Sequence, residues 1–261
     1  MSERPSVQRR RSGLASSSAA YRGGPIFNIP TPIGTIVIWT TIAFFLSMTF
    51  PSPTGPGPLV EDFSLVPVEF LARLETGAIL YAIVPLVGHI FMHGNLGHLL
   101  LNMAWLVVFG SGIARRLCVA RGSGRDRSYN LMLFLVFYLA CGIAGGLAQF
   151  FWDPLSPIGL VGASGAISGL MAGTLRFALR LFAPFGAEYG KLAPIWAQPV
   201  LLASLVYIGI NIGTGFAGAA GVEQASMIAW QAHIGGFLFG LVAFPLFDRL
   251  ARRPKLPFGL G

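Results

Sequence analysis

A serine lies among glycines and alanines in the stretch GASGAISG, residues 162–169, with apolar sequence on both sides. The hydroxyl of Ser164 is either a nucleophile or part of a small side chain that lets two helices pack closely. Glycines at positions 165, 169 and 173 repeat every fourth residue, the spacing of close helix packing in membranes, and alone this favours packing. The residue two positions after the serine is Ala, so the stretch differs from the G-x-S-x-G pattern of soluble hydrolases.

All four histidines of the chain, His89, His93, His98 and His233, lie in or beside apolar segments. Ionisable groups inside a membrane are costly and by default mark a functional site. A single histidine is equally well explained as a hydrogen-bonded member of a helix bundle, but four of them, with almost no intramembrane acids, favour a site. The spacing of His89 and His93 suits metal ligands, but their segment HIFMH lacks the Glu of H-E-x-x-H, so we expect no metal.

The remaining polar residues supply the parts of an acyl-transfer site. His98 and Asn102 are four residues apart, so they share one face of a helix and can both donate hydrogen bonds to an oxyanion. Ser164 lies at the start of a predicted helix, where backbone N–H groups are unpaired and the helix dipole is positive. With His233 as the base, these groups fit nucleophilic catalysis. Since no predicted helix carries an Asp or Glu at this depth, we expect a Ser–His dyad.

Positioning these residues requires a membrane domain built from helices. Hydrophobic residues make up 54% of the 261 residues and charged residues only 11%, against about 25% in soluble domains. The composition therefore predicts an all-α, polytopic membrane protein. Six apolar segments have the length of about 20 residues that a spanning helix needs. They lie near residues 33–50, 95–114, 129–151, 162–182, 196–217 and 227–248.

The basic residues predict the orientation of this domain. Apart from Arg73, every Lys and Arg falls in the N-terminal tail, in alternate connections or at the C-terminal end. The positive-inside rule then places both termini in the cytoplasm. The same clustering explains the net charge of +8 without nucleic acid as a partner. We expect a disordered basic tail over 1–30 (a mitochondrial transit peptide is the alternative), the membrane domain over 31–250 and a short cytoplasmic tail over 251–261.

Two connections outside the predicted spans bear on function. The first external loop, 51–94, opens with the turn-rich PSPTGPGP and continues with amphipathic and apolar sequence. We expect it to lie in the outer interface or dip into the membrane rather than span it. The segment 216–226, FAGAAGVEQAS, consists largely of small residues that suit a lid.

The two cysteines, Cys118 and Cys141, predict neither a disulfide nor a metal site.

Three motifs together resemble the rhomboid family of intramembrane serine proteases. HGNLGHLLLN, residues 93–102, is similar to the family pattern H-x-x-x-x-H-x-x-x-N. GASGAISG is similar to its G-x-S-G motif, and AHIGGFLFG, residues 232–240, to A-H-x-x-G-x-x-x-G. They occur in the family's order on the second, fourth and sixth helices, so the resemblance extends over roughly residues 30–250 and implies a six-helix rhomboid-like bundle.

The resemblance implies a role for each matching residue. Ser164 corresponds to the nucleophile, His233 to the general base, and His98 and Asn102 to oxyanion donors acting with the Ser164 backbone N–H. The supporting positions are Gly162, which opens the serine motif, the structural loop histidine His93, and Gly236 and Gly240, which let helix six lie against helix four.

Two positions depart from the family's pattern. Val84 and Pro85 stand where many members carry Trp-Arg in the first external loop, so the anchoring of that loop is expected to differ. Ser168 stands where many members have an aromatic residue that stacks on the catalytic histidine. Another group must therefore position the ring of His233.

The expected function is that of an intramembrane serine endopeptidase of the bacterial inner membrane. Its partners would be the lipid bilayer and transmembrane protein substrates, which enter between helices two and five and are cut near the outer boundary, without metal or cofactor. The sequence predicts no oligomeric state. One alternative is a non-catalytic rhomboid-like protein, although such relatives typically lack the serine or the histidine. The other is a transporter that uses Asn211, Gln149 and the histidines, although no inverted repeat is visible.

Overall fold

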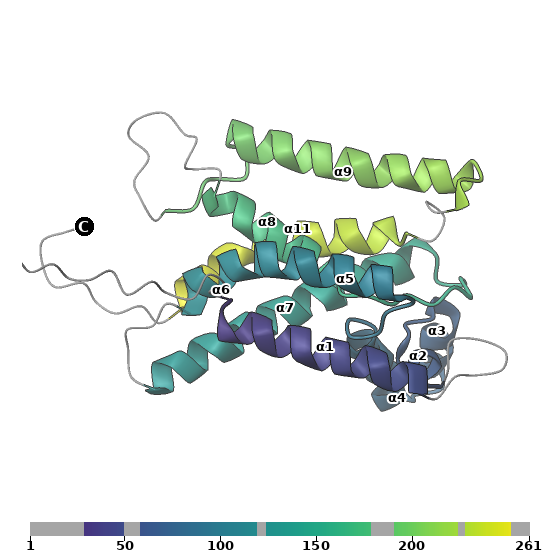
Figure 1. Ribbon diagram of the computed structural model, residues 1–261. Helices are drawn as coiled ribbons and strands as arrows, with labels where there is room; N and C mark the ends of the chain where they lie inside the picture. Colours follow the sequence, from purple (N-terminus) through teal and green to yellow (C-terminus); the bar gives the residue numbers. More distant parts are fainter. Residues whose placement is uncertain (1–28, 50–57, 119–123, 179–190, 224–227, 252–261) are drawn as a thin grey trace, which may run out of the picture.

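The computed structural model describes residues 29–49, 58–118, 124–178, 191–223 and 228–251. Within these ranges the regular structure is helical, apart from one isolated antiparallel bridge between Leu65 and Leu160 (Figure 1). Nearly all of the two predicted tails, residues 1–28 and 252–261, lies outside the described residues.

The long helices follow the predicted apolar segments. They are α1 (Thr31–Thr49), the continuous stack of α5 (Leu96–Trp105), η1 (Leu106–Gly110) and α6 (Ser111–Cys118), then α7 (Gly124–Trp152), α8 (Ser164–Ala178), α9 (Gln198–Ala219) and α11 (Trp230–Leu250). Five of these stretches, all except α8, are long and apolar enough to cross a membrane. The described part of α8 has 15 residues, and it begins at Ser164 rather than at the predicted 162.

The helices α7, α8 and α11 form the centre of the bundle and approach one another through small residues. A Cβ added to Gly236 would collide with the carbonyl oxygen of Gly165, and one added to Gly240 would collide with that of Gly169. Glycine at both positions therefore lets the backbones of α11 and α8 touch, the packing mode of membrane helices. Gly236 and Gly240, the residues predicted to let the last helix lie against the serine-bearing helix, lie at this contact between α11 and α8.

Helix α9 runs along one edge of the bundle, beside α8 and α11 (Figure 1). Only Val200, Ser204 and Asn211 of its 22 residues are buried. The predicted lid was placed too early in the chain, because α9 continues to Ala219 and residues 216–219 are helical. Sequence alone misses this boundary because Gly215, Gly218 and Gly221 offset the high helix propensity of the alanines between them. Residues 224–227 of the predicted lid lie outside the described residues.

The segment between α1 and α5 folds into three short helices, α2 (Pro58–Phe63), α3 (Pro67–Glu75) and α4 (Ile79–Gly88). The bridge to Leu160 at Leu65 and the edge-to-face contact of Phe70 with Phe150, with ring centroids 5.0 Å apart, fasten this segment to the end of α7 and the strand-like stretch before α8. With ten residues, α4 is apolar but too short to span, as expected for this loop.

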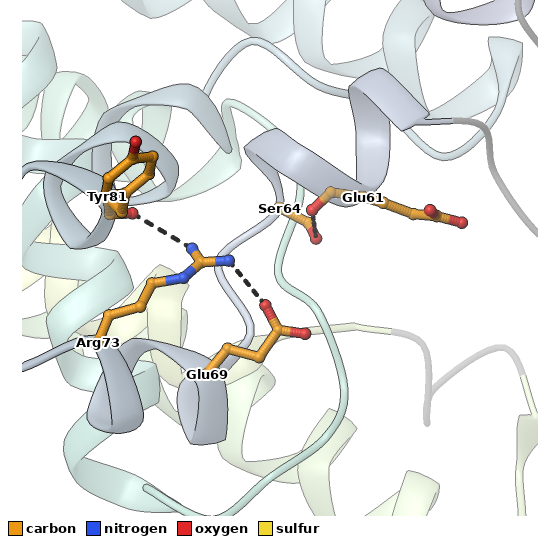
Figure 2. A network of polar contacts seen from close by, with 5 residues as sticks. All are labelled: Glu61, Ser64, Glu69, Arg73 and Tyr81. Carbon is orange, nitrogen blue, oxygen red and sulfur yellow. Dashed lines mark hydrogen bonds and ion pairs between the residues drawn. The ribbon is translucent and has the colours of Figure 1, made fainter. Parts of the chain in front are cut away.

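Arg73 ties α3 to α4 within this segment (Figure 2). Its guanidinium donates to the Glu69 carboxylate at 2.9 Å and to the carbonyl oxygen of Tyr81 at 3.3 Å. Just after α2, the Ser64 hydroxyl donates to the Glu61 carbonyl at 3.2 Å (Figure 2). The bond from Arg73 to Tyr81 joins α3 to α4, where Val84 and Pro85 lie, and the bridge at Leu65 joins this loop to the stretch before α8.

Candidate active site

Ser164 and His233 meet although 69 residues separate them in the chain. Ser164 is the first residue of α8, and His233 lies in the first turn of α11. The His233 Nε2 is 2.8 Å from the Ser164 Oγ, a hydrogen-bond distance. Both side chains are half-buried. The close contact of α8 with α11 is what brings a hydroxyl and an imidazole together at this point.

The turn that leads into Ser164 requires glycine at position 162. Gly162 has a φ of 118°, a conformation that L side chains rarely adopt. A Cβ there would also lie 2.7 Å from the Nε2 of His98, so the imidazole of His98 lies directly beside this turn. The Gly162 N–H donates to the carbonyl of His89 at 2.8 Å, which fixes the turn to the external segment. Beyond the turn, the first N–H groups of α8 have no intrahelical acceptor.

His98 and Asn102 come to this turn from α5. The Asn95 side chain caps that helix by accepting from the His98 N–H at 2.8 Å. Asn102 is 5% exposed, and its Nδ2 donates to the His98 carbonyl at 2.9 Å. An amide nitrogen carries two hydrogens, so one of these remains for another acceptor. The start of α8 thus has an imidazole, an amide and backbone N–H groups around it, the donor types of an oxyanion hole.

The other two histidines, His89 and His93, are buried and lie between α4 and α5, outside the spanning helices. Burial lowers the pKa of His89 and of His93 to about 4, so both rings are neutral at pH 7. The His89 Nδ1–H donates to the Pro85 carbonyl at 3.0 Å. The His93 ring packs edge-to-face on that of His98, with centroids 5.0 Å apart. Among the residues that the structure describes, no three His, Cys, Asp or Glu side chains group as metal ligands would.

Asn211 of α9 completes the surroundings of His233, and the sequence analysis had considered it only for transport. Its Oδ1 is 2.9 Å from the His233 Nδ1, and its Nδ2 donates to the Tyr207 carbonyl at 3.0 Å. The side chain is 6% exposed. The signal in the sequence was an amide in the middle of an apolar segment, where a polar side chain needs a hydrogen-bond partner.

Ser168, one turn after Ser164 on α8, is hydrogen-bonded both to Ser164 and to Tyr207 of α9. Its hydroxyl donates to the Ser164 carbonyl, and its Oγ is 2.6 Å from the Tyr207 hydroxyl. Since a serine has one hydroxyl hydrogen, Tyr207 must donate to Ser168. The Tyr207 ring stacks on Phe237 of α11, with centroids 4.6 Å apart. Tyr207 thus joins α9 to Ser168 of α8 and to Phe237 of α11.

Together, the apolar helices and the polar site buried among them define an integral, multi-pass membrane protein. The sequence model described as the Rhomboid domain matches residues 81–249, and the chain belongs to the rhomboid family. This family includes intramembrane serine proteases.

Two curated relatives are similar to part of this chain. "Rhomboid protease GluP" of Bacillus subtilis (strain 168) is 34% identical over 154 residues, which are 59% of this chain and 24% of that protein. "RHOMBOID-like protein 4" of Arabidopsis thaliana is 28% identical over 162 residues, which are 61% of this chain and 33% of that protein. The chain thus spans about a quarter and about a third of the length of these relatives.

Proposed function

We propose that the chain is an intramembrane serine endopeptidase that cleaves transmembrane protein substrates through a dyad of Ser164 and His233. The observation that carries this proposal is the 2.8 Å distance between the Ser164 Oγ and the His233 Nε2. Membership of the rhomboid family, and a relative named as a rhomboid protease, support it.

The reaction follows from the positions of these groups. His233 Nε2 accepts the hydroxyl proton as the Ser164 Oγ attacks the substrate carbonyl carbon and forms a tetrahedral intermediate. His98, Asn102 and the Ser164 backbone N–H hold the negative oxygen. The protonated ring then donates its Nε2 proton to the leaving amide nitrogen, the C–N bond breaks, and an acyl-enzyme remains. A water molecule, deprotonated by His233, hydrolyses the ester and regenerates the serine. No metal or cofactor takes part.

For the topology, we propose six spans with α8 as the fourth and both termini in the cytoplasm. The distribution of Lys and Arg supports this orientation. The starts of α5, α8 and α11, which carry the site, then face the outside, where water is available. On this basis we propose cleavage near the outer boundary of the bilayer, and from the compact six-helix plan we propose a bacterial inner membrane as the location.

The substrate helix would enter between α5 and α9. Both helices have faces of exposed apolar side chains, among them Leu100 and Leu101 on α5 and Leu205, Val206 and Ile210 on α9. Helix α9 is also the least buried of the candidate spans, with 17% of its apolar window inside the protein. A helix with few packed side chains can be displaced at a lower energetic cost than one in the core.

The test is cleavage of a model transmembrane substrate by the purified full chain in liposomes, beside Ser164→Ala and His233→Ala. We expect the wild type to cleave and both variants to be silent. We also expect a fluorophosphonate to label the wild type in a manner that requires both residues. Equal cleavage by all three proteins would attribute the activity to a contaminant and reject the proposal. A folded wild type that neither cleaves nor is labelled would instead be a non-catalytic rhomboid-like protein that binds membrane helices.

A further inference from the structure

The hydrogen bonds around Asn211 determine which nitrogen of His233 carries the proton. The carbonyl of Tyr207 can only accept, so the nitrogen of the Asn211 amide must face it, at 3.0 Å. The amide oxygen therefore faces the His233 ring, with the Oδ1 2.9 Å from the Nδ1. Because that oxygen can only accept, the Nδ1 must carry the hydrogen.

This arrangement leaves the other ring nitrogen ready for catalysis. A neutral imidazole has one N–H, so a protonated Nδ1 leaves the Nε2 with a free lone pair. The Nε2 lies 2.8 Å from the Ser164 Oγ and accepts its hydrogen. In the opposite tautomer, an Nε2–H would point at the serine, and the ring would be unable to take its proton.

We infer that Asn211 is a positioning residue that holds His233 in the Nδ1–H tautomer, an inference that rests on the proposed protease function. In Ser-His-Asp hydrolases a buried carboxylate has this task. Here α9 supplies a neutral amide, which provides the acceptor oxygen without placing an unpaired charge in an apolar span. After proton transfer to the Nε2 the Nδ1–H is still present, so the transfer itself does not break the bond to Asn211.

The geometry also fixes the orientation of the amide independently of His233. The bond from Asn211 to the Tyr207 carbonyl lies within α9 and spans one helical turn. The same tyrosine is held by its ring on Phe237 and by its hydroxyl on Ser168. The amide is thus oriented by its own helix before it meets the ring, which is the arrangement that a positioning role requires.

The tautomer can be observed directly by ¹⁵N NMR of the full chain with labelled histidine in lipid nanodiscs. The chain has four histidines, so a His233→Gln variant identifies the signals of this ring. For the wild type we expect a protonated Nδ1 and an unprotonated Nε2. We expect Asn211→Leu, which removes the acceptor at similar volume, to give the Nε2–H tautomer or a mixture. Asn211→Asp, which keeps an acceptor oxygen, should retain the Nδ1–H form.

The matched control is Ser204→Ala on the same helix. Ser204 is also buried, and its hydroxyl donates to the Val200 carbonyl at 2.7 Å, away from the dyad. A purely structural effect of losing a buried polar group on α9 would appear in this variant as well. We expect its His233 signals and its activity to match the wild type.

Kinetics provide the second readout. We expect Asn211→Leu to lower kcat about 100-fold, within the 10²- to 10⁴-fold range of a general base, and to change KM less than about twofold. Asn211→Asp should keep more activity than Asn211→Leu. A substrate-binding role would instead raise KM and leave kcat unchanged.

The two proposals fail in different ways. A wild type that neither cleaves nor labels, but has the Nδ1–H tautomer that Asn211→Leu abolishes, would reject the protease function and support the positioning of His233. An active wild type with an Nε2–H ring would overturn the inference whether or not the variants fold. So would an Asn211→Leu variant that retains both the tautomer and kcat.

Discussion

The carbonyl oxygen of Ala232, the residue before His233, lies between two glycines of neighbouring helices. A Cβ added to Gly145 of α7 would be 2.6 Å from this oxygen, and one added to Gly165 of α8 would be 3.2 Å from it. A methyl group therefore cannot be added to Gly145 unless α7 or the start of α11 moves. Gly145 itself has no role in the proposed chemistry.

We predict that Gly145→Ala lowers the cleavage rate by moving His233. An ordinary carbon–oxygen contact is about 3.3 Å, so the start of α11 must shift by about 0.7 Å. A shift of this size away from α7 presses the start of α11 toward α8 and disturbs the alignment of the Nε2 and the Oγ, which lie 2.8 Å apart. Because a misplacement of about 1 Å costs about 100-fold in rate, we expect kcat to fall between about 10- and 100-fold.

The assay is cleavage of the model substrate in liposomes, with thermal unfolding measured on the same samples. Gly209→Ala on α9 is the matched control, since it adds the same methyl group to a helix where nothing lies within 4 Å. We expect that variant to be fully active. Full activity of a folded Gly145→Ala, or an equal loss in Gly209→Ala, would refute the account of how packing aligns the dyad.

Three further predictions concern the turn before α8, the buried His89 and the ion pair between α6 and α11. Gly162→Ala should lower fluorophosphonate labelling about 10²- to 10³-fold, because the added Cβ would displace the His98 ring. The positive φ at this position should also cost about 1–3 kcal/mol of stability, measured by thermal unfolding. His89 has a pKa of about 4 when folded and about 6.5 when unfolded, so the unfolded state binds more protons between these values. Stability should therefore fall as the pH drops from about 6.5 to 4, and denaturant titrations should give a smaller fall for His89→Gln. Arg116 and Asp248 form an ion pair at 2.7 Å, and their side chains are only 14% and 11% exposed. Arg116→Met leaves the Asp248 carboxylate without the guanidinium, so the same titrations should show a loss of about 3–5 kcal/mol in the free energy of unfolding. A second change, Asp248→Leu, should restore much of this loss.

The sequence predicted the helices well because hydropathy over about 20 residues follows directly from the thickness of the bilayer. Every predicted segment overlaps a helix of the structure. The spacing of His98 and Asn102 on one helix face and the position of Ser164 at a helix start likewise follow from local geometry. These features depend only on the chain near each residue.

The partner of His233 could not be predicted in the same way. It depends on how α9 is rotated about its axis, and hydropathy gives no such angle when lipid-facing and core-facing residues are equally apolar. Within α9, Leu205 and Val206 are exposed while the buried positions include Ser204 and Asn211, so here the polar residues face inward. A polarity pattern reversed relative to soluble helices was therefore the available signal.

The site thus rests on two separate supports. Glycine contacts among α7, α8 and α11 set the distance from Ser164 to His233, whereas Asn211 of α9 sets the tautomer. Gly145→Ala should accordingly lower kcat while His233 keeps its Nδ1–H, and Asn211→Leu should lower kcat by changing that tautomer. Both variants disable the same proton transfer, so their effects should not multiply. The double variant should be about as slow as the slower single variant; a multiplicative loss would mean that one of the two acts elsewhere.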